Sequence, residues 1–259
     1  MPKRFTTLKE AGEKIALLTA YDATAARLQE KAGVDAMLVG DSLGMVVKGE
    51  KDTLNVRISE VAYHVRAVVA GAPNTFVIGD MPFGSFQQSP QHAFANAARL
   101  LTAGANMVKI EGGEDMAETV DFLVRRGVPV CAHVGLMPQS VRASGGYAVQ
   151  GRGDAAKQVH ADALSMQNAG AGMVVLELLP EALAQEITQN LAIPTIGIGS
   201  GRHCDGQVLV MQDMLGMSER HLRFTHNFLA ERSSIAEAFD LYVKAVKAGG
   251  FPSDEHAVQ

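Results

Sequence analysis

Short apolar runs that end abruptly on an ionisable residue recur along this chain, and they constrain its fold more than any other feature. The residues that follow or end successive runs are Asp41, Asp80, Lys109 with Glu111, His133 and Glu177. Continuous apolar runs of this length are typical of parallel strands that are buried on both faces. If the runs are neighbouring strands of one barrel, these side chains converge on one rim.

Between the apolar runs lie segments with helical periodicity and helix-start signals. Asp22 is a plausible N-cap for a helix over 23–32, and Ser89 followed by Pro90 opens another helix. Strand and helix alternate about eight times without a linker, which requires parallel strands with right-handed crossovers. In a chain of 259 residues, this alternation of strands and helices favours a (β/α)₈ TIM barrel over an open doubly wound sheet. We predict one TIM-barrel domain over 1–259, with an N-terminal cap helix and a C-terminal helix and tail.

The expected element boundaries follow from the runs and their breakers. The expected strands are 16–20, 36–39, 75–79, 107–110, 128–132, 173–176, 194–198 and 207–211, although the last segment fits a helix almost as well. The expected helices are 5–10, 23–32, 59–70, 90–103, 115–126, 155–169, 181–190 and 234–248. The loop 135–153 is longer than ordinary connections, which makes it a candidate functional loop. The turn 197–201 resembles a phosphate-cradling turn, but a close packing turn fits it better.

Composition and charge exclude several classes of function. The hydrophobic content of 47% allows a large core. The net charge of −5 does not indicate a protein that binds nucleic acid or an anionic membrane. No apolar run reaches the roughly 20 residues that span a bilayer, and the N-terminus lacks the apolar core of a signal peptide. We therefore expect a cytoplasmic protein in which Cys131 and Cys204 are reduced structural thiols, with a disulfide the less favoured alternative.

Three carboxylates are candidate metal ligands. Asp41, Asp80 and Glu111 are expected at the carboxyl ends of adjacent strands, where the active sites of such barrels lie. Three carboxylates on one rim repel each other unless a cation neutralises them, and hard oxygen ligands favour Mg²⁺ over Zn²⁺. The alternative for any one of them is a helix N-cap or a solvated loop acid.

The remaining candidates each have two interpretations. Lys109 faces the same side of its strand as Glu111, so it either binds an anionic substrate or forms a buried ion pair. His133 either contacts substrate or is a core histidine. Glu177 follows apolar residues, a setting that suits a base taking a proton from carbon, although an arginine pair is the alternative. Ser42 either donates a hydrogen bond or serves only its turn.

With these residues placed, the sequence resembles the ketopantoate hydroxymethyltransferase family. The matching stretches run from about residue 17 to residue 216 and include L-T-A-Y-D, M-L-V-G-D-S-L-G-M, V-K-I-E-G-G-E, P-V-C-A-H-V-G-L-M-P-Q-S, G-G-Y-A-V-Q-G-R-G-D and D-G-Q-V-L-V-M. The tail F-P-S-D-E-H is also similar to the family's ending. Met137 and the segment 84–88 depart from the family pattern.

The resemblance implies a barrel of the phosphoenolpyruvate/pyruvate type with one Mg²⁺ per subunit, assembled as a homodecamer. It implies transfer of a hydroxymethyl group from the co-substrate 5,10-methylenetetrahydrofolate to 3-methyl-2-oxobutanoate in pantothenate biosynthesis. The products are 2-dehydropantoate and tetrahydrofolate, and the mechanism, similar to that of class II aldolases, passes through a metal-stabilised enolate.

The family's residue roles fall on matching positions of this chain. The implied metal ligands are Asp41, Asp80 and Glu111, and the implied substrate contacts are Asp41, Ser42, Asp80, Lys109 and His133. Glu177 is the implied proton acceptor. Two rivals stay open: a lyase of the same barrel type that works without folate, and a barrel that binds a keto acid or folate without turnover. Such lyases usually carry a reactive cysteine in a mobile loop, which is not found here.

Overall fold

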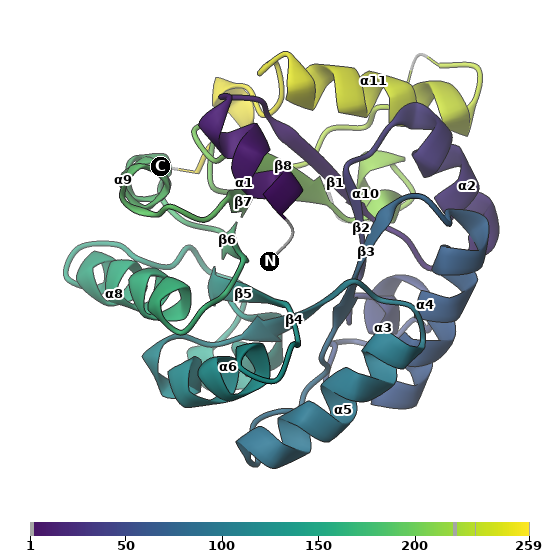
Figure 1. Cartoon of the computed structure of the whole chain (residues 1–259). Coiled ribbons are helices and arrows are strands. Elements are labelled where there is room, and N and C mark those ends of the chain that lie inside the picture. The colour runs from purple at the N-terminus through teal and green to yellow at the C-terminus, as the bar shows by residue number, and fades with distance from the viewer. Residues whose placement is uncertain (1–2, 220–221, 231, 259) are drawn as a thin grey trace.

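Eight parallel strands form a closed barrel in which the order around the barrel is the order along the chain (Figure 1). The computed structural model describes residues 3–219, 222–230 and 232–258. The strands are β1 (Ile15–Thr19), β2 (Ala36–Val39), β3 (Phe76–Asp80), β4 (Met107–Glu111), β5 (Val130–Gly135), β6 (Met173–Glu177), β7 (Thr195–Ile198) and β8 (Gly206–Leu209). The segment 207–211, expected as a strand although a helix fitted it almost as well, forms most of strand β8 and the first residue of a short helix; β8 pairs with β7 and β1 and closes the barrel. The predicted TIM barrel is confirmed.

Helices surround the strands, and most lie where helical periodicity predicted them (Figure 1). The helices are α1 (Lys3–Glu10), α2 (Ala23–Ala32), α4 (Ile58–Gly71), α5 (Pro90–Thr102), α6 (Ala117–Val124), α8 (Ala155–Asn168), α9 (Glu181–Asn190) and α11 (Ile235–Lys247). Both predicted N-caps are confirmed, since the Asp22 carboxylate accepts from two backbone N–H groups and the Ser89 hydroxyl accepts from one. The expected helix over 115–126 is instead a short 3₁₀ turn, η1 (Glu114–Met116), followed by α6.

Several short helical pieces lie in the loops, where no periodic signal predicted them. They are α3 (Leu43–Val46), η2 (Pro138–Ser140), α7 (Val141–Ser144), α10 (Met211–Met214) and η3 (Asp254–His256). Pieces of three or four residues are too short to show an apolar stripe, so sequence periodicity cannot detect them. Three of them, α3, η2 and α10, follow strands and shape the rim of the barrel.

The amino end of the barrel is closed by α1, which lies across it (Figure 1). The Phe5 ring is completely buried and meets the Phe76 ring edge-to-face at 5.0 Å. Phe5 belongs to the same apolar cluster as the inward residues Leu17, Ile78 and Val175. Burying a side chain of this size stabilises the fold by roughly 1.5–3 kcal/mol. The plugged amino end leaves the carboxyl end for ligands.

The C-terminal helix α11 packs on β1 and α2. Its Tyr242 is buried, and the hydroxyl donates to the carbonyls of Leu17 and Gln207 on the two strands that close the barrel. Cys131 and Cys204 are both buried and unpaired by disulfide, which confirms the predicted free thiols. Among the helices that the structure describes, none has the length and apolarity needed to cross a bilayer.

Candidate active site

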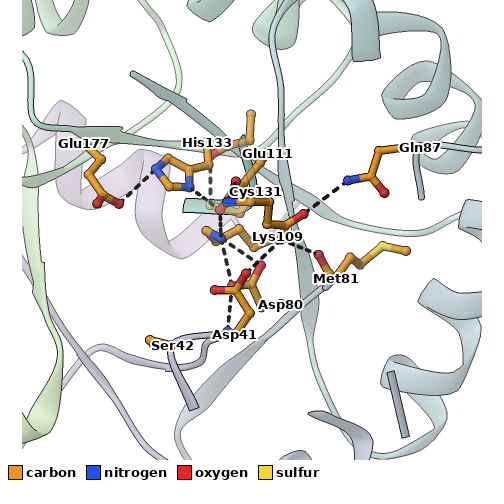
Figure 2. A network of polar contacts seen from close by, with 12 residues as sticks. Asp41, Ser42, Asp80, Met81, Gln87, Lys109, Glu111, Cys131, His133 and Glu177 are labelled. Atoms are coloured by element: carbon orange, nitrogen blue, oxygen red, sulfur yellow. Dashed lines mark hydrogen bonds and ion pairs between the residues drawn. The ribbon is translucent and has the colours of Figure 1, made fainter. Parts of the chain in front are cut away.

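The strand register brings the predicted ionisable residues to the same level of the carboxyl rim. Asp80 is opposite Lys109, Glu111 is opposite His133, and Glu177 is opposite Gly135. With Asp41 and Ser42 after β2, these side chains line one cavity of about 640 Å³ (Figure 2). The convergence predicted from the strand endings is therefore present.

Lys109 is the positive centre of the site. Its ammonium lies 2.8 Å from both carboxylate oxygens of Asp80 and 3.5 Å from Oε1 of Glu111 (Figure 2). Burial disfavours the charged amine, but the three carboxylates of Asp80, Glu111 and Asp41 outweigh burial and raise the pKa of Lys109. The ammonium therefore stays charged. Its main partner is Asp80 on the neighbouring strand. The i, i+2 spacing of Lys109 and Glu111 on one strand had suggested Glu111 instead.

Asp41 lies beside Asp80 at the start of the β2–α3 loop. Its backbone N–H donates to Oδ2 of Asp80 at 3.1 Å, which fixes the two acids next to each other. Burial and the charge of Asp80 raise the pKa of Asp41 well above its ordinary value, despite the opposing charge of Lys109. A cation at this carboxylate would relieve that penalty. The neighbouring Ser42 hydroxyl lies 2.8 Å from the hydroxyl of Tyr21.

Gln139 is a buried site residue that sequence reasoning missed. Its side-chain amide donates to Oδ2 of Asp41 and to the carbonyl of Met81, each at 3.0 Å. Its backbone N–H donates to Oε2 of Glu111 at 3.0 Å. The residue lies on η2, inside the long loop 135–153. Loop length was the only signal for it, because a single polar residue in a loop has no periodicity.

His133 lies between two carboxylates (Figure 2). Its Nδ1 is 3.5 Å from Oε1 of Glu111, and its Nε2 is 3.2 Å from Oε2 of Glu177. Neither contact has hydrogen-bond geometry, so the attraction is electrostatic. Burial and the Lys109 charge lower the pKa of His133, but the two carboxylates outweigh them and raise it to about 9. His133 is therefore an imidazolium at neutral pH. Neither interpretation from the sequence, a substrate contact or a core histidine, included this charge.

Glu177 ends β6 and faces His133 rather than a purely apolar wall or an arginine. The next residue, Leu178, has a φ of 49°, in the left-handed region that a leucine rarely adopts. Its backbone is held there by hydrogen bonds with Ile198 and Gln150. Backbone strain of this kind costs about 1–3 kcal/mol and persists only where surrounding contacts enforce it. The turn after Glu177 is thus rigidly defined.

The glycine-rich turn 197–201 braces this strand end. The Ser200 hydroxyl donates to the Leu176 carbonyl at 2.7 Å and accepts from the Leu179 N–H at 3.2 Å. A Cβ at Gly199 would lie 2.8 Å from the Leu178 side chain and 3.1 Å from the Phe224 ring. The turn is therefore packed tightly against β6, as the packing interpretation predicted.

The acidic side chains do not form a complete metal cage. Within the described residues, no three His, Cys, Asp or Glu side chains gather into a group that could hold an ion by themselves. Glu111 nevertheless has a buried oxygen, Oε1, without a hydrogen-bond partner among the described residues. Asp41 and Asp80 remain adjacent and open into the cavity.

Comparison with known sequences gives one consistent result. The family model described as ketopantoate hydroxymethyltransferase matches residues 2–254. The chain is 56% identical to the 3-methyl-2-oxobutanoate hydroxymethyltransferase of Thiobacillus denitrificans, with 99% of this chain and 100% of that protein covered. It is 58% identical to the enzyme of the same name from Nitrosomonas europaea, with 97% and 95% covered.

Solved structures share the fold at low sequence identity. Phosphoenolpyruvate phosphomutase from Streptomyces platensis subsp. rosaceus is 13% identical with a TM-score of 0.61, and 82% of each chain is covered. A 2,3-dimethylmalate lyase, a member of the PEP mutase/isocitrate lyase superfamily, is 17% identical with a TM-score of 0.60, with 80% of this chain and 79% of that chain covered. These likenesses confirm the (β/α)₈ barrel fold.

Proposed function

The chain belongs to the ketopantoate hydroxymethyltransferase family, and we propose how its barrel mouth carries out that family's reaction. The reaction consumes one water molecule, transfers the one-carbon unit of 5,10-methylenetetrahydrofolate to 3-methyl-2-oxobutanoate as a hydroxymethyl group, and yields 2-dehydropantoate and tetrahydrofolate. One observation supports the assignment of roles: Asp41, Asp80, Lys109, Glu111, His133 and Glu177 line a single cavity.

We propose that Asp41 and Asp80 hold Mg²⁺, with Glu111 as a further ligand. The donor set fits this ion, because Mg²⁺ prefers oxygen and is usually bound by one or two carboxylates, with water and substrate oxygens in the remaining positions. The raised pKa of Asp41 supports a cation at that carboxylate. Oε1 of Glu111 accepts no hydrogen bond from the described residues, although it faces the charges of Lys109 and His133. When bound, Mg²⁺ supplies Lewis-acid polarisation of the keto oxygen.

Lys109 and Ser42 are the proposed groups that bind the keto acid. The Lys109 ammonium is buried and fixed by Asp80, so it can face an anionic substrate oxygen without reorganising. The Ser42 hydroxyl is oriented by Tyr21 and can donate to a carboxylate oxygen. Together they would hold the substrate with its branched carbon toward β6.

Glu177 is the proposed base that takes the proton from the branched carbon C3. Oε2 of Glu177 lies 3.2 Å from Nε2 of the His133 imidazolium, which leaves the other oxygen to receive the proton. Nδ1 of His133 lies 3.5 Å from Glu111, and this chain of ion pairs links the base to the proposed metal site. The carbanion electrons then form the C–C bond to the one-carbon unit. Over the whole reaction both bonds from that carbon to folate nitrogens break, water supplies the hydroxyl oxygen, and the protons released by C3 and water pass to the folate nitrogens.

The assay of purified protein with 3-methyl-2-oxobutanoate and methylenetetrahydrofolate, with EDTA and then with added Mg²⁺, tests this proposal. We expect 2-dehydropantoate only when both substrates are present, loss of activity in EDTA and recovery with Mg²⁺. Turnover of a 2-oxo acid without folate would favour the lyase alternative. Binding of both ligands without product would favour the binding-protein alternative.

We further propose, from the family resemblance, that residues 1–259 fold as one domain and assemble as a homodecamer in the cytoplasm. Light scattering should then give ten times the chain mass of 27.5 kDa. Calorimetric unfolding should show no second transition that corresponds to a fragment released by limited proteolysis. A smaller particle, or a stable fragment released by proteolysis, would contradict these proposals.

A further inference from the structure

The cavity extends beyond the space that a five-carbon keto acid fills. Its volume is about 640 Å³. The polar groups of the keto-acid site at the strand ends are mostly buried, whereas Tyr147 and Leu222, which line the same cavity, are exposed. The outer walls include the apolar side chains of Met45, Tyr147, Leu222 and Phe224. A site with apolar walls and few polar groups suits a flat aromatic or heteroaromatic ring.

Asp213 is the one carboxylate on α10 that lines this cavity. It lies after β8, apart from the acids of β2 to β6. Its Oδ1 accepts from the Ser218 hydroxyl, and no ion pair joins it to a cation among the described residues. Burial raises its pKa despite the opposing hydrogen bond from Ser218, so the ionised form is only partly compensated. A ligand that brings hydrogen-bond donors would add to that compensation.

The position of α10 on the rim places Asp213 near the substrate-binding end of the cavity. The N–H of Met211, at the start of α10, donates to the Thr19 hydroxyl of β1 at 2.9 Å. Since α10 follows β8 and is tied to β1, Asp213 lies on the side of the rim next to β2, which Asp41 and Ser42 follow. Glu177, the proposed base, lies on β6. A ligand that contacts Asp213 can therefore reach across the mouth toward the keto acid.

We propose that Asp213 binds the 2-amino-4-oxo edge of the reduced pterin ring of the folate co-substrate. That edge presents a 2-amino N–H and the ring N3–H side by side, a donor pair that two carboxylate oxygens can accept in parallel. The apolar outer walls would contact the faces of the ring. This inference rests on the proposed function, because it assigns part of that same cavity to the one-carbon donor.

A purely structural role for Asp213 makes a different prediction. The Ser218 contact could serve only to brace the loop after α10. In that case Ser218→Ala, which removes the contact, would weaken binding at least as much as Asp213→Asn. Asp213→Asn keeps the size of the side chain and an oxygen for Ser218, but it places an N–H₂ donor against the pterin donors. The two variants therefore separate ligand binding from loop bracing.

Calorimetric titration with tetrahydrofolate is the test, using the Mg²⁺-loaded full-length protein. We expect Asp213→Asn to weaken tetrahydrofolate binding at least 30-fold, and Ser218→Ala to change it less than threefold. The wild-type protein should bind the 2-desamino-2-methyl analogue at least 30-fold more weakly than tetrahydrofolate. The affinities of Asp213→Asn for tetrahydrofolate and for this analogue should differ less than threefold. A loss in Ser218→Ala that equals or exceeds the loss in Asp213→Asn, or unchanged binding in Asp213→Asn, would overturn the inference.

A parallel titration with 3-methyl-2-oxobutanoate separates this inference from the proposed function. We expect both variants to bind the keto acid within threefold of the wild-type protein. A loss of keto-acid binding that matches the loss of tetrahydrofolate binding would make Asp213 a structural residue and overturn the inference. If the wild-type protein turns over both substrates while Asp213→Asn keeps its folate affinity, only the Asp213 assignment fails. If the wild-type protein does not bind tetrahydrofolate, the proposed function fails with it.

Discussion

The ammonium of Lys109 lies 2.8 Å from both carboxylate oxygens of Asp80, across two adjacent strands of the barrel. Both side chains are almost inaccessible to solvent, with exposed fractions of 5% and 1%. Because three buried acids surround this one amine, its charge stabilises both the folded rim and any anion that binds there. Removing it should therefore affect stability and substrate binding together.

Lys109→Met should destabilise the metal-free protein by about 3 kcal/mol, because it leaves buried carboxylates without their cation. It should also weaken 3-methyl-2-oxobutanoate binding about 100-fold, a loss typical of a removed charge-stabilising donor. Urea unfolding and calorimetric titration measure the two effects. Lys244→Met is the matched control, because Lys244 forms only an exposed pair with Asp240 and should change stability by less than about 1 kcal/mol. Equal stability of the two variants would contradict this picture.

Gln139→Leu should weaken Mg²⁺ binding by about 10- to 100-fold, the range expected when a partner of a metal ligand is lost. The amide of Gln139 holds Asp41, so its removal frees that carboxylate to rotate. Titration of Mg²⁺ in the absence of substrate measures the change. Gln87→Leu is the control, because exposed Gln87 donates to Oε1 of Gln139 at 3.2 Å but makes no hydrogen bond to Asp41 among the described residues. Unchanged Mg²⁺ affinity in Gln139→Leu would show that Asp41 needs no such support.

The imidazolium of His133 predicts a specific pH dependence of stability in the metal-free protein. Its pKa is raised from 6.5 to about 9 in the folded state. A raised pKa means that the stabilisation is fully present below pH 6.5 and is lost as the pH rises through 9. The loss should approach ~3 kcal/mol, and His133→Gln should remove this slope. Urea unfolding across that pH range checks it, and parallel curves for the two proteins would contradict it.

Both cysteines should be unreactive in the native protein. Cys131 and Cys204 are fully buried, and burial raises the pKa of each thiol to about 12. Since the thiolate is the reactive form, a thiol reagent at pH 8 should label neither until urea unfolds the chain. Two labelled thiols should then appear. Rapid labelling of a native cysteine would revive the lyase alternative, which uses a reactive cysteine.

The apolar runs made the barrel and most of its rim predictable. Asp41, Asp80 and Glu177 follow or end such runs, and a parallel strand that ends on an acid carries that acid to the rim. The pairing of Lys109 with Asp80 could not be predicted in this way, because it depends on the register between two strands. The eighth strand stayed ambiguous because β8 is followed directly by the short helix α10.

Gln139 and Asp213 show where sequence reasoning ends. Each lies in a short helical piece within a loop, and only the three-dimensional path of that loop brings it to the cavity. His133 was recognised as a candidate, but its charge state could not be predicted. That charge results from two carboxylates on neighbouring strands, and pairwise distances of this kind are fixed by packing.

Proton exchange at the branched carbon of 3-methyl-2-oxobutanoate tests most directly whether Glu177 removes that proton. In D₂O with Mg²⁺, the wild-type protein should incorporate deuterium at C3, as measured by NMR. Glu177→Gln should lower this exchange at least 1000-fold while it binds the keto acid and Mg²⁺ with nearly unchanged affinity, since general-base catalysis contributes roughly 10²–10⁴-fold. Exchange at the wild-type rate in Glu177→Gln would contradict the account.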